Sequence, residues 1–146
     1  MSRTYDVIDA DGHVCEPPDL WANYIDPKFR ETAPRIIVDK DGKERTWVEG
    51  KILGSPNGLA LAGSVGLPAD QIKKMKYLDG RKGGFDPHAR IDDMDLDGID
   101  AAFLYPTVGL TSGAITAPDL AAAVCRAYNR WIADFCKPYP DRLFGV

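Results

Sequence analysis

The second half of the chain carries the clearest alternation of apolar and polar positions. Between Ala117 and Lys137, apolar residues recur at helical spacing and predict a long helix with one buried face. Thr116 and Asp119 have the spacing of a capping box, Pro118 lies in the first turn, and Pro138 closes the helix. The buried face comprises Leu120, Ala123, Val124, Ala127, Tyr128, Trp131, Ile132 and Phe135.

A shorter helix and two strands flank this long helix. Residues 89–97 predict a helix that ends at Gly98, where a C-terminal glycine is expected. Residues 99–105 form a mostly apolar run that suits a strand buried on both faces, and residues 142–146 begin another strand. The inward positions expected on the shorter helix are Ile91, Met94 and Leu96.

The first half of the chain predicts less regular structure. Residues 5–10 predict a short strand, and Asp19 is a candidate cap for a short helix after it. Two β-prone runs at 36–38 and 45–48 flank Asp41-Gly42, which favours an antiparallel hairpin outside the main sheet. Residues 50–87 are rich in Gly, Pro and Lys and predict a long excursion with a short helix near 69–77.

The order of elements is therefore strand, excursion, helix, strand, helix, strand. This alternation predicts an α/β fold with a parallel sheet. We expect one domain over residues 1–146, with an insertion at about residues 17–87.

Composition and charge exclude several classes of partner. Hydrophobic residues make up 45% and charged residues 27%, as in soluble globular proteins. The net charge of −4 and the absence of a basic face argue against nucleic acid, and no apolar run approaches the roughly 20 residues that cross a bilayer. The cysteines at 15, 125 and 136 are odd in number and scattered, which argues against disulfides and favours a cytoplasmic location.

The candidate chemistry lies at Asp11-Gly12-His13, directly after the first strand. Side chains two residues apart on a strand point to the same side, so a carboxylate oxygen and an imidazole nitrogen would aim at one point. Such groups are suitable ligands for Zn²⁺ or a similar divalent ion, and Gly12 lets the backbone bend between them. Glu16 follows as a candidate for a further ligand, for a group that orients a ligand, or for a general base.

Other reactive residues favour structural roles. Cys15 is expected to be a small buried thiol rather than a nucleophile. His88 precedes the shorter helix and is expected to support it, for example as a cap. Ser55 and Ser64 lack the setting of a nucleophile elbow.

Several separated segments together carry a family resemblance: Val7–Pro17, Asp86–Asp100, Tyr105-Pro106-Thr107, Tyr128–Cys136 and Pro140–Gly145. They resemble the amidohydrolase-related family of the amidohydrolase superfamily, which contains aminocarboxymuconate semialdehyde decarboxylase and its relatives. They follow the family's order over nearly the whole chain, and they resemble its N-terminal portion.

The resemblance implies a distorted (β/α)₈ barrel of the TIM type, with a divalent metal at the C-terminal ends of the strands. The family's first strand typically ends in His-x-His, and Asp11 and His13 occupy those two positions here. Both are therefore implied as ligands of Zn²⁺ or Mn²⁺, while Glu16 and Tyr105 are candidates to orient a ligand or to bind substrate. The family's later ligands, a His and an Asp on other strands, have no counterpart in this sequence.

A complete barrel needs about 250 residues, so we expect this chain to form strands one to three of a partial barrel. It would be a truncated reading frame, a fragment, or one piece of a homo-oligomer or of an assembly that another chain completes. The resemblance implies a metal-dependent hydrolase that acts on a C–N or C–O bond of a small molecule. The alternatives are a non-oxidative decarboxylase (a lyase) of a small carboxylated substrate, or a non-catalytic remnant that only oligomerises or binds.

Overall fold

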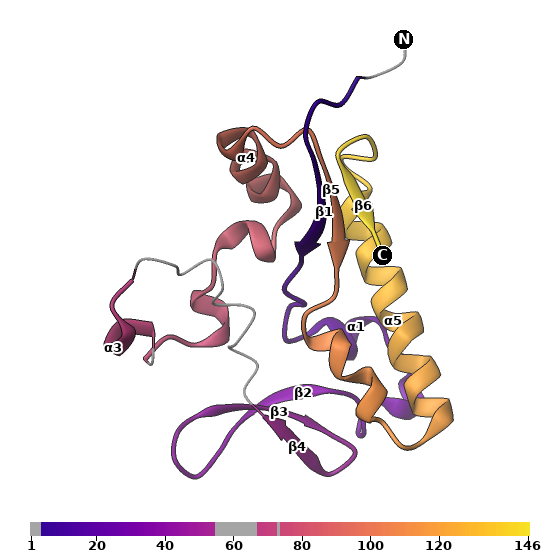
Figure 1. Ribbon diagram of the computed structural model, residues 1–146. Coiled ribbons are helices and arrows are strands. Elements are labelled where there is room, and N and C mark those ends of the chain that lie inside the picture. The colour runs from indigo at the N-terminus through magenta and orange to yellow at the C-terminus, as the bar shows by residue number, and fades with distance from the viewer. Residues whose placement is uncertain (1–3, 55–66, 73) are drawn as a thin grey trace.

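Two three-stranded sheets form the framework of the computed structural model, which describes residues 4–54, 67–72 and 74–146 (Figure 1). One sheet is parallel, with β5 (Ala101–Tyr105) between β1 (Ile8–His13) and β6 (Leu143–Gly145). This confirms the predicted parallel sheet and its three strands. The protein is thus a mixed α/β structure.

The long helix α5 (Pro118–Cys136) covers one face of the parallel sheet and presents to the core the eight residues that the helical spacing predicts. Its buried side chains form one cluster with Leu104 of β5 and Leu143 of β6. The short helix α1 (Leu20–Tyr24) packs against α5 and adds Leu20 and Trp21 to the same cluster.

The first turn of α5 is held by a residue that is distant in the sequence. Ala117 is the N-cap and has no capping side chain, so the predicted capping box of Thr116 and Asp119 is wrong. The carboxylate of Glu49 instead accepts hydrogen bonds from the N–H groups of Thr116 and Ala117, both at 2.8 Å, and from the hydroxyl of Thr116 at 2.9 Å. A carboxylate beside the free N–H groups of a helix start is a favourable acceptor, and these bonds lower the pKa of Glu49.

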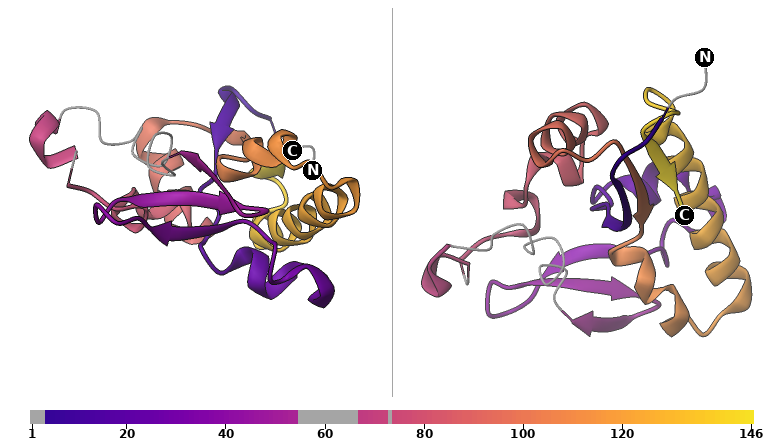
Figure 2. Two further views of the ribbon diagram at one scale, coloured as in Figure 1. Left: turned by 90° about the horizontal axis from the view of Figure 1, so that it is seen from below. Right: turned by 45° about the horizontal axis from the view of Figure 1, so that its top comes forward.

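The second sheet is antiparallel and lies beyond the C-terminal ends of β1 and β5 (Figures 1 and 2). Its strands β2 (Arg35–Val38) and β3 (Glu44–Val48) pair as the predicted hairpin, with Gly42 at φ +75° in the turn. The third strand, β4 (Lys51–Gly54), falls in the segment that the sequence predicts as an irregular excursion. It pairs with β3 in antiparallel fashion, and the register of this pairing shifts between Thr46 and Trp47.

Shorter elements connect these layers. The helix α3 (Ala69–Ile72) is shorter than predicted. Single 3₁₀ turns span Pro27–Phe29 (η1), Tyr77–Asp79 (η3) and Lys82–Gly84 (η4), and a longer 3₁₀ helix spans Val108–Ala114 (η5). Asp19 precedes α1, but its side chain makes no capping hydrogen bond and accepts instead from the Asn23 side-chain amide at 2.8 Å. Within the described residues, no helix is long and apolar enough to span a membrane.

The helix α4 (Pro87–Asp97) leads into β5 and ends as predicted at Gly98, whose φ is +71°. Met94 is buried, but Leu96 is 76% exposed, so its expected inward position is wrong. Two residues along a helix turn the side chain by about 200°, which carries Leu96 away from the face of Met94.

The αL conformation at Gly98 should make a side chain costly there. Gly98→Ala is expected to lower the free energy of unfolding by about 1 kcal/mol, because a Cβ at this position meets no neighbour within 4 Å and only backbone strain is added. Gly113→Ala is the matched control, since its Cβ also meets nothing and its φ is not positive. The free energy of unfolding of each variant is measured by denaturant unfolding followed by circular dichroism. An equal loss in Gly98→Ala and Gly113→Ala would contradict the prediction.

Candidate functional site

The end of β1 departs from a regular strand at the predicted Asp-Gly-His segment. The pairing of β1 with β5 shifts register between Asp9 and Gly12, and the N–H of Asp11 donates to the Asp9 carboxylate at 3.0 Å. A Cβ on Gly12 would lie 2.8 Å from the Asp9 carboxylate and 3.0 Å from the carbonyl oxygen of Phe103. A side chain here would crowd the Asp9 carboxylate and the main chain of β5, so the close approach of the strands favours glycine between the two candidate ligands.

The imidazole of His13 is held in one orientation by the loop after β5. His13 pairs with Tyr105, and its Nδ1 lies 2.8 Å from the carbonyl oxygen of Pro106. A carbonyl oxygen can only accept, so Nδ1 carries the hydrogen and the neutral ring keeps its lone pair on Nε2. A histidine that ligates a metal usually has this arrangement, with the other ring nitrogen donating to a carbonyl or carboxylate.

Arg90 of α4 fixes the main chain at the same residue. Its Nη2 donates to the carbonyl oxygen of His13, while its Nε is buried and has no hydrogen-bond partner among the described residues. Burial lowers the pKa of the Arg90 guanidinium, and the nearby charge of Asp9 opposes that effect. Both the side chain and the carbonyl of His13 are thus held by groups outside β1.

Glu16 joins the loop after β1 to the loop after β5. It is only 1% exposed, yet its carboxylate accepts from three consecutive N–H groups: Thr107 at 3.1 Å, Val108 at 2.9 Å and Gly109 at 2.7 Å. These are the free N–H groups at the start of η5, so the carboxylate acts as the cap of that turn. Because the same segment begins at Pro106, Glu16 also fixes the carbonyl that orients His13.

The surroundings of Glu16 are apolar and tightly packed. Tyr77 is fully buried and donates its hydroxyl to the carbonyl oxygen of Glu16 at 3.0 Å. Burial raises the pKa of the Glu16 carboxyl above its ordinary value of 4.5, and the three amide donors oppose that rise. Burial also raises the pKa of the Cys15 thiol to about 11, so this cysteine stays protonated at neutral pH and is a buried thiol, as predicted.

The structure brings together some of the predicted site residues. The ring centroids of His13 and Tyr105 lie 6.2 Å apart on neighbouring strands, and Asp11 is exposed within the irregular part of β1. The convergence of Asp11 with His13 and their role as metal ligands stay predictions. Among the described residues, no group of three His, Cys, Asp or Glu side chains is placed to hold a metal ion.

Two other sequence predictions concern residues away from this site. His88 has the expected structural role, because its Nδ1 lies 2.8 Å from the Tyr139 hydroxyl, although the side chain that caps α4 is that of Asp86. Ser55 and Ser64 lie outside the described residues. Sequence reasoning missed Arg90 and the Pro106 carbonyl. Pro106 directly follows β5, which is a weak signal, but nothing local marks Arg90 within α4.

Comparison with solved structures identifies the fold. The chain is similar to the amidohydrolase map2389c from Mycobacterium avium subsp. paratuberculosis K-10, with a TM-score of 0.70 and 21% identity. At this identity the likeness shows a shared fold. The match covers 99% of this chain and 43% of the mycobacterial chain, so the described protein spans less than half of that enzyme's length.

The other comparisons add no relative. No protein-family model matches the chain, and no curated protein matches it significantly. The fold therefore rests on the structural likeness, and the chemistry must be argued from the residues at the strand ends.

The pH dependence of stability should reveal the charge state of Glu16. Its folded pKa is raised, so the folded state retains the proton to a higher pH than the unfolded chain does. The stability of the wild-type chain relative to Glu16→Gln, whose amide does not titrate, should fall as the pH rises from about 4.5 through the folded pKa. Unfolding both proteins in denaturant at several pH values measures this difference.

A relative stability that rises with pH would contradict the raised pKa of Glu16. A wild-type chain that gains stability over Glu16→Gln as the pH rises would show that the three amide donors hold the pKa of Glu16 below 4.5. At neutral pH, Glu16→Ala should be less stable than Glu16→Gln by about 1–3 kcal/mol, because it leaves the buried N–H groups of Thr107 and Val108 and the half-buried N–H of Gly109 without their acceptor.

Proposed function

We propose that this chain carries the first-strand part of the active site of a metal-dependent hydrolase of the amidohydrolase type. In this proposal the parallel sheet is strands one to three of a TIM-type barrel, and residues of about 17–87 form an insertion. Asp11 and His13 are two ligands of a divalent ion, with Zn²⁺ as the first choice and Mn²⁺ as the second. The likeness to an amidohydrolase fold supports the reaction class.

The hydrogen bond from His13 Nδ1 to the Pro106 carbonyl oxygen is the observation that carries the proposal. It leaves Nε2 as the nitrogen with a free lone pair, and it fixes the plane of the ring. His13 also lies at the C-terminal end of a parallel strand, where barrel enzymes keep their catalytic groups.

The residues of this chain fit one part of a metal site. Asp11 and His13 are chemically suited to a divalent ion, but zinc sites use at least three protein ligands, and the described residues supply no such group. A bound divalent ion would polarise a substrate carbonyl or lower the pKa of a bound water. We therefore propose that activity needs further ligands from outside the described residues.

The remaining residues of the site would position the ligands. Arg90 holds the His13 carbonyl, and Glu16 holds the loop that carries the Pro106 carbonyl. Tyr105 lies beside the His13 ring and would face a small-molecule substrate. The substrate in this proposal has a C–N or C–O bond to be hydrolysed, and a small carboxylated compound that loses CO₂ is the second candidate because the family resemblance includes decarboxylases.

Metal titration of the purified 146-residue chain tests the proposal. Calorimetry with Zn²⁺ and with Mn²⁺ is expected to show weak binding, because the chain offers two ligands. His13→Ala should weaken the binding by at least about tenfold, and Asp11→Asn should also weaken it.

His88→Ala is the matched control for the loss of an imidazole. The His88 imidazole contacts the Tyr139 hydroxyl, whereas the His13 imidazole contacts the Pro106 carbonyl oxygen, so removal of His88 should leave the metal affinity unchanged. Equal effects of His13→Ala and His88→Ala would point to nonspecific binding and would sink the assignment of His13. Metal binding by His13→Ala that is as tight as in the wild-type chain would also show that His13 is not a ligand.

A further inference from the structure

The strand β1 contains one residue more than the part of β5 with which it pairs. Ile8 is paired with Ala101 near the start of the two strands. His13 lies five residues after Ile8, yet its partner Tyr105 lies only four residues after the partner of Ile8. The register shifts within the segment Asp9–Gly12, so the extra residue forms a β-bulge there.

This bulge determines which face of the sheet His13 occupies. Paired residues point to the same face, and so do residues an even number apart along a regular strand. Because their partners on β5 are four residues apart, Ile8 and His13 lie on one face despite their odd separation. It is the exposed face, with Ile8 50% and Phe103 40% exposed, whereas Ala102 and Leu104 point to the opposite face and are buried in the cluster with α5. Without the bulge, His13 would point to the buried face.

The carboxylate of Asp9 holds the bulge. Asp9 pairs with Ala102 and therefore lies on the buried face. Its Oδ1 accepts from the N–H of Asp11 at 3.0 Å, within the segment that contains the extra residue. Its Oδ2 would lie 2.8 Å from a Cβ on Gly12, so the carboxylate closes over that glycine. We infer that Asp9 is a positioning residue, whose carboxylate holds the bulge that turns His13 onto the exposed face.

The charge of Asp9 also acts on Arg90 of α4. The Arg90 guanidinium donates to the carbonyl oxygen of His13. Burial lowers the pKa of this guanidinium, and the charge of Asp9 acts in the opposite direction. Asp9 therefore reaches His13 by two routes, through the main chain of the bulge and through the side chain that holds the His13 carbonyl.

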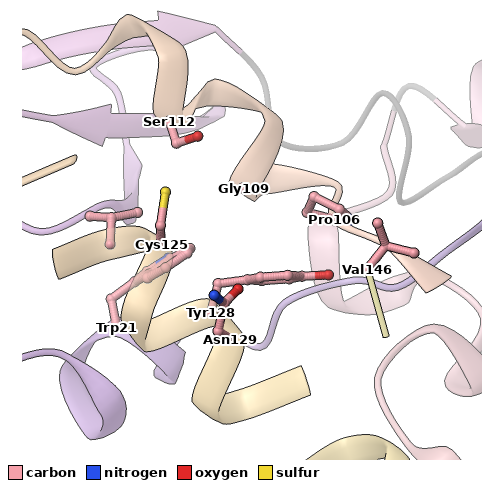
Figure 3. A pocket seen from close by; sticks show the side chains of 9 residues that line it. Trp21, Pro106, Gly109, Ser112, Cys125, Tyr128, Asn129 and Val146 are labelled. Carbon is pink, nitrogen blue, oxygen red and sulfur yellow. The ribbon is translucent and has the colours of Figure 1, made fainter. Parts of the chain in front are cut away.

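The acceptor of the His13 imidazole is fixed independently of Asp9. This acceptor is the carbonyl oxygen of Pro106, in the loop after β5, and it lies 2.8 Å from Nδ1. The Pro106 residue also lines a hollow beside Tyr128 of α5 (Figure 3). Because Glu16 binds the N–H groups that follow in the same loop, loss of the Asp9 carboxylate should change the direction of the imidazole and leave its acceptor in place.

The positioning role rests on the proposed function, because the exposed face is the one on which His13 would meet a metal ion. The orientation itself can be measured without metal, in the presence of EDTA. A failed metal titration would remove the ligand role of His13 and leave its orientation unaffected. A wrong orientation would instead show directly in the NMR signals of the metal-free chain.

NMR of the intact, metal-free chain tests the role of Asp9. The wild-type chain should show NOEs between the rings of His13 and Tyr105, whose centroids lie 6.2 Å apart, and a neutral imidazole protonated on Nδ1. Asp9→Ala should lose both signals. Hydrogen exchange at the Asp11 amide should also become faster by about fivefold, because the N–H loses its acceptor.

Asp9→Asn is the conservative variant that should restore the orientation. Its side-chain oxygen can still accept from the N–H of Asp11, so the signals of His13 should match those of the wild-type chain. Asp39→Ala is the matched control. Asp39 also accepts from an N–H two residues later, that of Asp41 at 2.9 Å, but in the turn between β2 and β3. Its removal should leave the signals of His13 unchanged.

Deletion of Ala10 tests the bulge itself. Combined with Asp9→Ala, the deletion removes the extra residue, so a regular strand would carry His13 to the exposed face without a bulge to be held. The NOEs between His13 and Tyr105 should therefore return. A general loss of stability in Asp9→Ala would not be corrected by a shorter strand.

Three results would overturn the role of Asp9. One is a wild-type chain without NOEs between the rings of His13 and Tyr105. Another is an Asp9→Ala chain that folds and keeps both these NOEs and the proton on Nδ1. If Asp9→Ala does not fold, recovery of the fold on deletion of Ala10 supports the role, and a double variant that also fails to fold contradicts it.

Discussion

The arrangement of the loops at the C-terminal end of the parallel sheet depends on the hydrogen bonds of the buried Glu16 carboxylate. Glu16 lies just after β1, and its three acceptor bonds reach N–H groups that follow β5, 91 to 93 residues later in the chain. Strand pairing alone brings β1 beside β5, but it does not fix the loops beyond the strands. Glu16 fixes them, and the Pro106 carbonyl that orients His13 belongs to the fixed loop.

Sequence periodicity predicted the parts of the fold that depend on local patterns. The buried face of α5, the hairpin of β2 and β3, and the glycine end of α4 each follow from residues within one element or one turn. The cap of α5 could not be predicted in this way, because Glu49 lies 67 residues before Thr116. The strand β4 was missed for a related reason. Its four residues form a strand because they pair with β3, and a segment this short shows no clear pattern of its own.

The residues of the candidate site also differ in whether a local pattern or a long-range contact reveals them. Asp11 and His13 were found from their spacing and from the family resemblance, because both lie in one short segment. The groups that hold His13 were not found, because Arg90 and Pro106 lie 77 and 93 residues away from it and a main-chain carbonyl leaves no mark in a sequence. Glu16 was identified as a candidate, but only the fold shows that its carboxylate is occupied by three amides.

The orientation of His13 is the central claim, and its tautomer tests that claim most directly. Long-range ¹H–¹⁵N NMR of the imidazole groups, with His88→Ala used to assign the two histidines, reports which ring nitrogen carries the proton. The hydrogen bond to Pro106 predicts that neutral His13 is protonated on Nδ1 and that added Zn²⁺ perturbs the Nε2 signal. A neutral His13 protonated on Nε2 would contradict the account, because its free lone pair would then face the Pro106 carbonyl oxygen.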